Sequence, residues 1–212
     1  TLAAGTDKPS FTFEKKFVLD TTDYFQRYTG SRVGSLSLNM SAGSIITGSL
    51  GLSALKETTD TSIITNATYT NANTNDVMAA PDMANITVGN VSGDVFLTDL
   101  TLNISNNLRN QNAIGELYSV GVGYGLREVT GNMTVYFTAD TKQIYDDFVN
   151  GAEASLSFDL TDGTNTYTVT IPRVKYTSGQ VTAGGNNQDV LAEMGWQGLY
   201  DSGEATSIKI VK

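Results

Sequence analysis

The sequence predicts an all-β fold, a barrel or sandwich, with one flanking α-helix and one long protruding loop or hairpin. The composition is the first indication, because the 212 residues are rich in Thr, Ser, Asn, Gly, Val and Tyr and include only 3 prolines. β-Branched and aromatic residues favour strands, and Asn, Gly and Ser favour tight turns. The second indication is that apolar and polar residues alternate with a period of two along most of the chain. The third is that one segment has helical spacing and one long stretch has no periodicity.

The first clear alternation covers residues 35–53. Leu36, Leu38 and Met40 alternate with small polar residues, a turn follows at residues 41–44, and the alternation resumes through Leu50 and Leu52. Because successive side chains of a strand point to opposite faces, this pattern predicts a hairpin with one apolar and one polar face.

Further strands are predicted by the same alternation at residues 99–104, 133–137 and 190–197. The clearest hairpin covers residues 154–172, where Asp162-Gly163 separates two alternating runs and supplies the positive φ that such turns need. Residues 206–211 are expected to form a last strand.

One amphipathic helix is predicted after residue 140. Asp140 is the expected N-cap, with Gln143 as its capping-box partner. The apolar face consists of Ile144, Tyr145, Phe148 and Val149. Gly151 is placed to end the helix.

The stretch from residue 56 to residue 94 is rich in Thr, Asn, Ala and Asp, and its apolar residues are scattered. A connection of this length is usually functional or disordered. The β-branched runs at 61–65 and 85–88 favour a protruding two-stranded arm, which needs a partner surface because an isolated pair of strands is marginally stable. We therefore interpret residues 56–94 as an inter-subunit arm. Its expected contact residues are Ile63, Ile64, Tyr69, Met78, Met83, Ile86 and Val88.

Catalysis is disfavoured because the chain contains no His and no Cys. Ser-His-Asp and Cys-His mechanisms and His or Cys zinc sites are therefore excluded, whereas carboxylate pairs, Lys nucleophiles and Mg²⁺ or Ca²⁺ sites are not. The glycine-rich residues 121–125 lack the Lys and the strand–loop–helix setting of a phosphate-binding loop. Asp146 and Asp147 are interpreted as a solvated helix face. We predict no enzyme activity and no cofactor.

The formal net charge of −9 repels nucleic acid and anionic membranes, since phosphate contacts require Lys and Arg. No apolar run approaches the roughly 20 residues that span a bilayer. The chain begins at Thr1 and not at Met, so we expect either processing or additional upstream sequence.

Several segments resemble a tail tube family of long-tailed bacteriophages and related prophages. They are residues 24–30 (Tyr-Phe-Gln-Arg-Tyr-Thr-Gly), the Ser-Leu-Ser-Leu strand at 35–38, the strand at 131–137, and residues 181–189 leading into 194–197. The resemblance covers essentially the whole chain, and the order of these motifs is specific to the family. The resemblance implies a single tail tube domain over residues 1–212, a barrel or sandwich of the tail tube type.

The resemblance further implies a non-enzymatic subunit that forms rings, either hexamers or pseudo-hexameric trimers, which stack into a tube. The implied partners are other copies of the chain and the tail terminator, tape measure and tail tip proteins. The tube would be assembled in the host cytoplasm and become part of the virion, and DNA would pass through its lumen without specific binding. We assign the polar face of residues 35–53 to the lumen, with the candidates Ser35, Ser37, Asn39, Thr47 and Ser49.

Two alternatives from other classes stay open on the residues themselves. One is a bacterial surface or secreted β-sandwich that acts in adhesion or carbohydrate binding, with tyrosines and Trp196 as a sugar-stacking platform. The other is a hydrolase that uses a carboxylate pair. The aromatic residues are spread along the chain and are not gathered in one set of loops, which favours core and interface roles.

Overall fold

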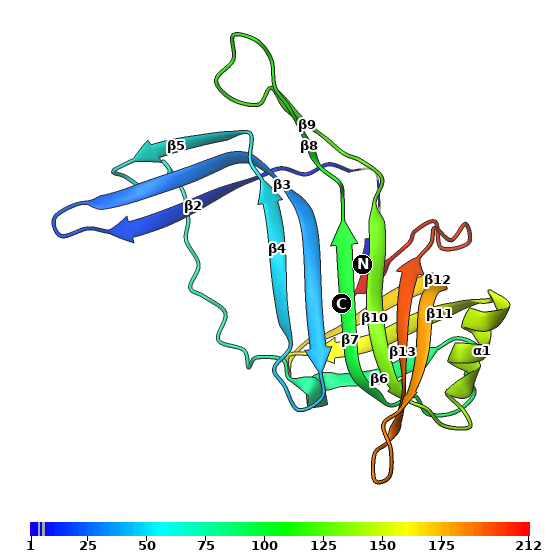
Figure 1. The fold of residues 1–212 in the computed structure, drawn as a ribbon. Helices are drawn as coiled ribbons and strands as arrows, with labels where there is room; N and C mark the ends of the chain where they lie inside the picture. The colour runs from blue at the N-terminus through cyan, green and yellow to red at the C-terminus, as the bar shows by residue number, and fades with distance from the viewer. Residues whose placement is uncertain (4, 6) are drawn as a thin grey trace.

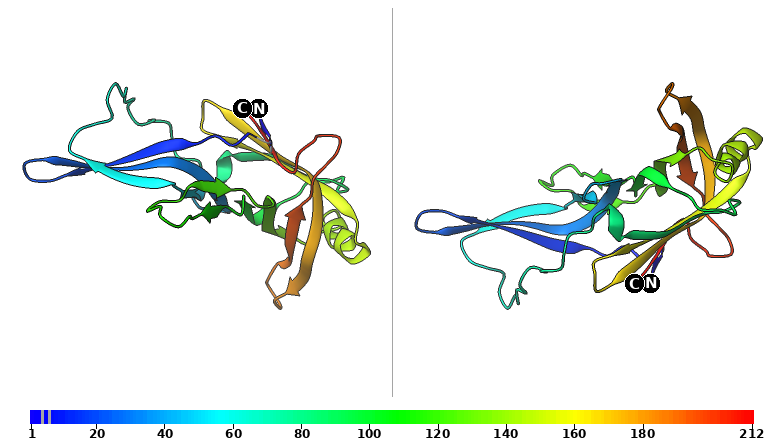
Figure 2. Two further views of the ribbon diagram at one scale, coloured as in Figure 1. Left: turned by 90° about the horizontal axis from the view of Figure 1, so that it is seen from above. Right: turned by 90° about the horizontal axis from the view of Figure 1, so that it is seen from below.

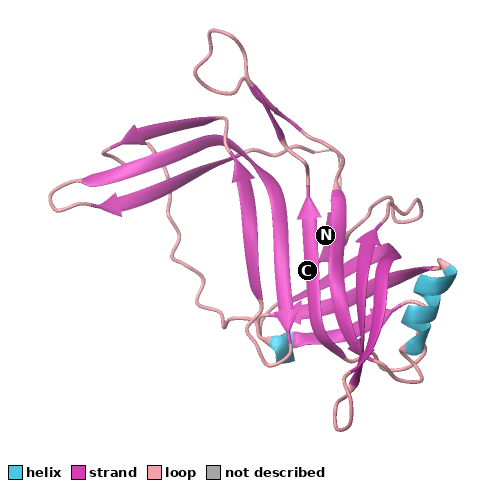
Figure 3. Ribbon diagram, in the orientation of Figure 1, coloured by secondary structure: helices cyan, strands magenta, loops and turns pink. Residues whose placement is uncertain are grey.

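The computed structural model describes residues 1–3, 5 and 7–212. They form one continuous antiparallel sheet of twelve strands that folds over into two packed layers (Figure 1). Strands account for most of the chain, with one short α-helix at the side (Figure 3). The sheets are not closed, so the prediction of an all-β fold is confirmed in its sandwich form.

The first layer carries the longest run of neighbouring strands. Its order is β4 (Thr47–Ser53), β3 (Asp23–Ser41), β7 (Leu97–Ser105), β10 (Glu128–Tyr136), β13 (Val190–Gly198) and the C-terminal half of β12 (Thr166–Ala183). The hairpin predicted at residues 35–53 is β3 with β4, and Ser37 lies opposite Ser49.

The second layer is formed by β6 (Met83–Val88), β11 (Glu153–Thr161), the first half of β12, β14 (Lys209–Val211) and β1 (Leu2–Ala3). Strand β12 belongs to both layers, because it pairs with β11 up to Lys175 and with β13 from Val174 onward. A register irregularity between Tyr176 and Ser178 accompanies the change of layer. Such irregularities bend a strand and increase its twist, which allows one sheet to fold over itself.

The core lies between the two layers and is built by the period-two pattern. Leu100, Leu102 and Met133 of the first layer meet Leu156 and Phe158 of the second, all at most 1% exposed. The hairpin predicted at residues 154–172 is β11 with β12, in which Phe158 lies opposite Val169. The predicted last strand is shorter than expected, since β14 contains only Lys209–Val211.

Helix α1 (Lys142–Asn150) packs against β12 with Ile144 completely buried. Gly151 ends it in the left-handed region at φ 64°, as predicted. The predicted cap is wrong, because the N-cap is Thr141 and not Asp140. The Gln143 amide donates to the Asp147 carboxylate 2.7 Å away and does not form a capping box.

Two further expectations for this helix are wrong. Val149 is 65% exposed, so the apolar face is narrower than its spacing indicates. Asp147 is buried at 3% exposure and is not part of a solvated face. The Asn90 amide donates to its Oδ2 over 2.9 Å, which provides the hydrogen bond that a buried carboxylate requires.

A three-stranded extension projects from the sandwich (Figure 2). It consists of β2 (Phe11–Val18), the first part of β3 up to Ser31, and β5 (Lys56–Asp60), with β3 in the middle. A separate short hairpin, β8 (Arg109–Gln111) with β9 (Gly121–Gly123), projects from the end of the first layer. No helix among the described residues is long and apolar enough to cross a membrane.

The stretch 56–94 does not form the two-stranded arm that its β-branched runs favour. Residues 56–60 are strand β5 of the extension, residues 61–79 contain no strand, and a 3₁₀ turn at Ala80–Asp82 leads into β6. The runs 61–65 and 85–88 do not pair, because β6 pairs with β11 in the second layer. Apolar burial against β11 outweighs local pairing, since it places Val88 at 3% exposure in the core.

Candidate assembly surfaces

The outer face of the first layer is almost entirely polar. Along β7, β10 and β13 its residues alternate with buried core residues, and register places them side by side across six strands. All five lumen candidates lie on this face: Ser35, Ser37, Asn39, Thr47 and Ser49. They are joined there by Asp99, Thr101, Asn103, Thr130, Asn132, Thr134, Glu193, Gln197, Ser178 and Gln180.

The charge on this polar face is negative. Asp99, Glu128 and Glu193 contribute carboxylates, and the Ser41 hydroxyl donates to Asp99 over 2.6 Å. Lys175 lies opposite Gln197, at the side where β12 changes layer, and its ammonium donates to the Gly151 carbonyl at the end of α1. The middle of the face is therefore lined by hydroxyls, amides and carboxylates.

The first layer ends in two open strand edges that differ from each other. Among the described residues strand β4 pairs only with β3, and its apolar side chains Leu50 and Leu52 are 51% and 42% exposed. At the other end, residues 177–183 of β12 pair with β13 and with no other strand that the structure describes. Unpaired strand edges offer a row of backbone donors and acceptors to another chain, and exposed leucines beside them increase that tendency.

One side of the extension is held by a cluster of charged residues around Arg27. Its Nε donates to Glu14 over 2.6 Å, its Nη1 donates to Asp60 over 2.9 Å, and its Nη2 donates to the carbonyl of Ser62. The Tyr69 hydroxyl also donates to Glu14. This cluster fixes the start of the segment 61–79 over the extension.

These contacts shift the pKa values of the two carboxyls. The Tyr69 hydroxyl and the Arg27 guanidinium stabilise the Glu14 carboxylate, so the pKa of Glu14 lies below its ordinary value. Arg27 and the backbone N–H groups of Ser62 and Thr61 lower the pKa of Asp60 in the same way. Both carboxylates and the guanidinium are therefore charged at neutral pH, whereas the hydrogen bond to Glu14 raises the pKa of Tyr69 and keeps its hydroxyl protonated.

The other side of the extension exposes aromatic rings. Phe13 lies opposite Tyr28 and Phe17 lies opposite Tyr24, and Phe11 and Phe13 are 47% and 37% exposed. A pocket of about 450 Å³ lies where this aromatic side meets β4, with Phe13, Tyr28 and Leu52 in its lining. The aromatic side and the β4 edge therefore form one continuous exposed surface.

The seven residues expected in the arm fall into two groups. Ile63 and Tyr69 are 51% and 58% exposed and Ile64 is half-buried, all in the segment 61–79. The other four belong to the sandwich: Met78, Met83 and Ile86 pack against the core, and Val88 is part of it. The Asn75 amide fastens the end of the segment by donating to Asp162 over 2.9 Å.

Sequence reasoning missed the extension as a protruding surface. The alternation of Phe11, Phe13 and Phe17 with polar residues predicts a strand there. Nothing in that alternation shows that the strand leaves the sandwich, because the pattern does not distinguish a core from an exposed aromatic face.

Among residues 1–3, 5 and 7–212, no group of three or more acidic side chains is arranged to hold a metal ion. The exposed surfaces described above are strand edges, polar strand faces and aromatic strand faces. Surfaces of this kind are typical of a structural protein that associates through its sheets.

A comparison with known protein families identifies a match over most of the chain. Residues 2–198 match the family described as phage tail tube protein, and the chain belongs to this family. It is therefore a structural component of a phage tail. No curated protein matches the chain.

Proposed function

We propose that this protein is the repeating subunit of the tail tube, that its copies close into rings, and that stacked rings form the conduit through which DNA is ejected. The observation that carries the proposal is the pair of dissimilar open edges on the layer that also bears the polar face. The family match supports the tail tube role.

The two edges support a head-to-tail contact. A contact between two different surfaces of the same protein is heterologous, and it generates a ring when the rotation closes. Pairing the β4 edge of one copy with the 177–183 edge of the next would continue the first layer around the ring. Closure would remove both open edges, as it does in a barrel, and cover Leu50 and Leu52.

The polar face supports a lumen on the outer side of the first layer. The second layer covers the opposite side of the same strands, so the polar face is the side left free. Asp99, Glu128 and Glu193 repel phosphates, and hydroxyl and amide groups offer no counterion release. DNA would therefore slide past this wall without binding to it.

The extension supports an additional lateral contact. Its aromatic side is continuous with the β4 edge, so a neighbour paired with β4 would also cover Phe11 and Phe13. The segment 61–79 presents Ile63 and Tyr69 beside it, and we propose that these two also contact a neighbour. We propose either a hexamer or a pseudo-hexameric trimer as the closed ring. The further partners we propose are the tape measure, tail terminator and tail tip proteins.

Electron microscopy and sedimentation of the purified protein test the proposal. Regular tubes or closed rings with a central channel are expected as the concentration rises. Stable monomers that bind glycans would instead support the surface-adhesion or carbohydrate-binding alternative. The proposed assembly in the host cytoplasm can be checked by imaging tubes in cells that express the chain alone.

A further inference from the structure

We propose that the extension is a hinged lever that turns relative to the sandwich about Gly30 of β3, and that the segment 61–79 is a tether that limits the turn. The turning of the extension is a property of the single subunit. A neighbouring copy bound along β4 stops it at one angle. This last step rests on the proposed ring contact and adds a conformational change to it.

Gly30 bends β3 where the extension leaves the sandwich. It lies inside a strand of 19 residues, yet its φ of 62° is in the left-handed region that interrupts a regular strand. Up to Ser31, β3 pairs with β2 and β5, and from Arg32 onward it pairs with β4 and β7. Gly30 therefore lies where β3 exchanges one set of partner strands for another.

The strands beside Gly30 are interrupted at the same level. On one side, residues 54 and 55 separate β4 from β5, and the Leu55 N–H donates to the Thr29 carbonyl over 3.1 Å. On the other side, the register of β2 shifts between Phe11 and Phe13. Register irregularities bend a strand, so irregularities at one level in neighbouring strands define a line about which the whole sheet bends.

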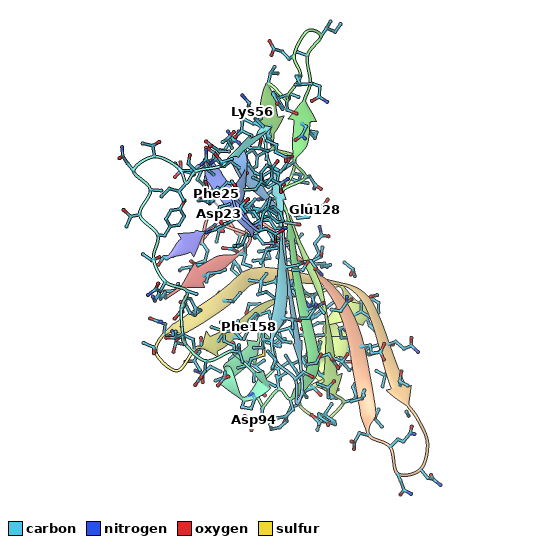
Figure 4. The ribbon with its side chains drawn as sticks, turned by 90° about the vertical axis from the view of Figure 1, so that its left-hand side faces the viewer. Asp23, Phe25, Lys56, Asp94, Glu128 and Phe158 are labelled. Carbon is cyan, nitrogen blue, oxygen red and sulfur yellow. The ribbon has the colours of Figure 1, made fainter. Side chains whose placement is uncertain are left out.

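Each side of this line has its own buried centre. Phe25 of the extension is 4% exposed, although it does not belong to the core between the two layers. It lies two residues from Arg27 in β3 and so on the side of the extension that the Arg27 cluster occupies. Figure 4 shows Phe25 and Phe158, which is in the sandwich core, in separate parts of the molecule. The extension can therefore turn as one body without disturbing the core.

A pocket at the bend leaves room for the turn. This cavity of about 450 Å³ is lined on one side by Phe13 and Tyr28 of the extension, and on the other by Leu52 of β4 and Asn110 of β8. Protein interiors contain few voids larger than a water molecule, so the extension is not fully packed against the sandwich here. A turn toward the aromatic side of the extension closes this pocket.

The segment 61–79 lies across the extension from the pocket. Glu14 and Phe13 are neighbours in β2 and point to opposite faces of the sheet. Phe13 lines the pocket, whereas Glu14 accepts a hydrogen bond from the Tyr69 hydroxyl of the segment. A turn that closes the pocket therefore lengthens the path that the segment must cover.

Two anchors give the segment a fixed reach. Tyr69 is attached to the extension, and the Asn75 amide donates to Asp162, in the turn between β11 and β12, over 2.9 Å. Residues 70–74 between the anchors are all exposed and form no strand. An extended chain spans at most about 3.5 Å per residue, so the chain from Tyr69 to Asn75 reaches about 20 Å at most. The segment therefore sets how far the extension turns.

A neighbour bound along β4 would cross the line of the bend. Leu52 of β4 and Phe13 of the extension line the same pocket from its two sides, so a surface that covers both residues contacts both bodies. Such a surface holds the extension at one angle. The lateral contact would therefore select one of the orientations that the single subunit adopts.

Distances between pairs of spin labels, measured by double electron–electron resonance on the single subunit, test the hinge. The chain contains no Cys, so labels attach only where Cys is introduced. Val18→Cys with Val149→Cys places one label at the far end of the extension and one on α1, both at exposed positions. Val149→Cys with Thr164→Cys keeps both labels in the sandwich and is the reference pair.

The extension pair is expected to give a broader distance distribution than the reference pair. Strand β2 has 8 residues and is about 24 Å long, so a turn of about 10° moves its far end by about 4 Å. A distribution as narrow as that of the reference pair would overturn the hinge.

Substitutions of Gly30 test the pivot. Val disfavours the left-handed region, so Gly30→Val should shift the mean distance of the extension pair, whereas Gly30→Asn should not, because Asn tolerates that region. In both variants the Cβ meets the end of the Leu55 side chain, so this contact cancels in the comparison. Gly43→Val replaces a positive-φ glycine of the β3–β4 turn and is the control for lost stability. An unchanged mean distance in Gly30→Val would exclude Gly30 as the pivot.

Asn75→Ala combined with Tyr69→Phe removes both anchors and is expected to broaden the distribution of the extension pair further. A distribution that does not change would contradict the role of the segment as a tether.

The effect of a neighbour is measured in rings, with labelled chains diluted into unlabelled ones. The distribution of the extension pair should narrow to the width of the reference pair, and one that stays broad would overturn the arrest by a neighbour. Failure of the wild-type protein to form rings would contradict the proposed function. It is a separate result, because the hinge is measured on the single subunit.

Discussion

The indole of Trp196 lies across the α-carbon of Gly131, its register partner on the neighbouring strand. Trp196 is 1% exposed and is the largest side chain of the core. A Cβ at position 131 would overlap Cζ2 of the indole and the carbonyl oxygen of Thr101 on the other side. The packing of Trp196 therefore depends on the absence of a side chain at position 131 of β10.

Gly131→Ala is expected to lower the free energy of unfolding by about 1–3 kcal/mol, the usual cost of overpacking a core. Gly34→Ala is the matched control, because its Cβ would lie 3.4 Å from Leu108, an ordinary contact. Urea unfolding of both variants compares them directly. Equal stability of the two would show that the Trp196 indole and the Thr101 carbonyl both move aside without cost.

Leu50→Lys is expected to block ring formation while changing the stability of the isolated subunit by no more than about 0.5 kcal/mol. Leu50 is half exposed on the β4 edge, so a charge there is solvated in the monomer but lies in the proposed contact between copies. Sedimentation measures the loss of rings. Val149→Lys on α1 is the control, and rings that form normally from the Leu50 variant would remove β4 from the lateral contact.

Ser37→Lys combined with Thr47→Lys is expected to slow DNA ejection, because two cations per subunit on the lumen wall would bind phosphates. The slowing should weaken as salt rises. Thr87→Lys adds a cation to an exposed position of the second layer and serves as the control. Ejection kinetics of phages with tubes of normal length provide the measurement, and unchanged kinetics would place the polar face outside the lumen.

The extension is expected to loosen at acidic pH. The folded-state pKa values of Glu14 and Asp60 lie below the ordinary 4.5 and 3.8, so their contacts with Arg27 stabilise the fold above those values and are lost as the pH falls below them. Hydrogen-exchange protection of β5 amides should therefore fall between about pH 5 and pH 3.

Arg27→Met provides the control for this pH dependence. It removes the guanidinium, so β5 protection should already be low at neutral pH and should change little on acidification. Protection of β5 that is the same in the variant and the wild type at pH 7 would show that the backbone pairing with β3 suffices without the ion pairs.

The sequence by itself determined several of the strands and which of their side chains share a face. The alternation at residues 35–53 and 154–172 depends only on neighbouring side chains pointing to opposite faces, so it survives in the structure as the β3–β4 and β11–β12 hairpins. The same alternation placed all five lumen candidates on one face.

Only the tertiary structure decided which strands meet and which surfaces stay open. Periodicity indicates that one face of a strand is covered, but it does not show what covers that face. It therefore did not show that β6 packs in the core and is not part of an arm. Nor did it show that the aromatic side of the extension is exposed and is not a core face. The burial of Asp147 could not be predicted for the same reason, because Asn90, which donates a hydrogen bond to its carboxylate, is distant in sequence.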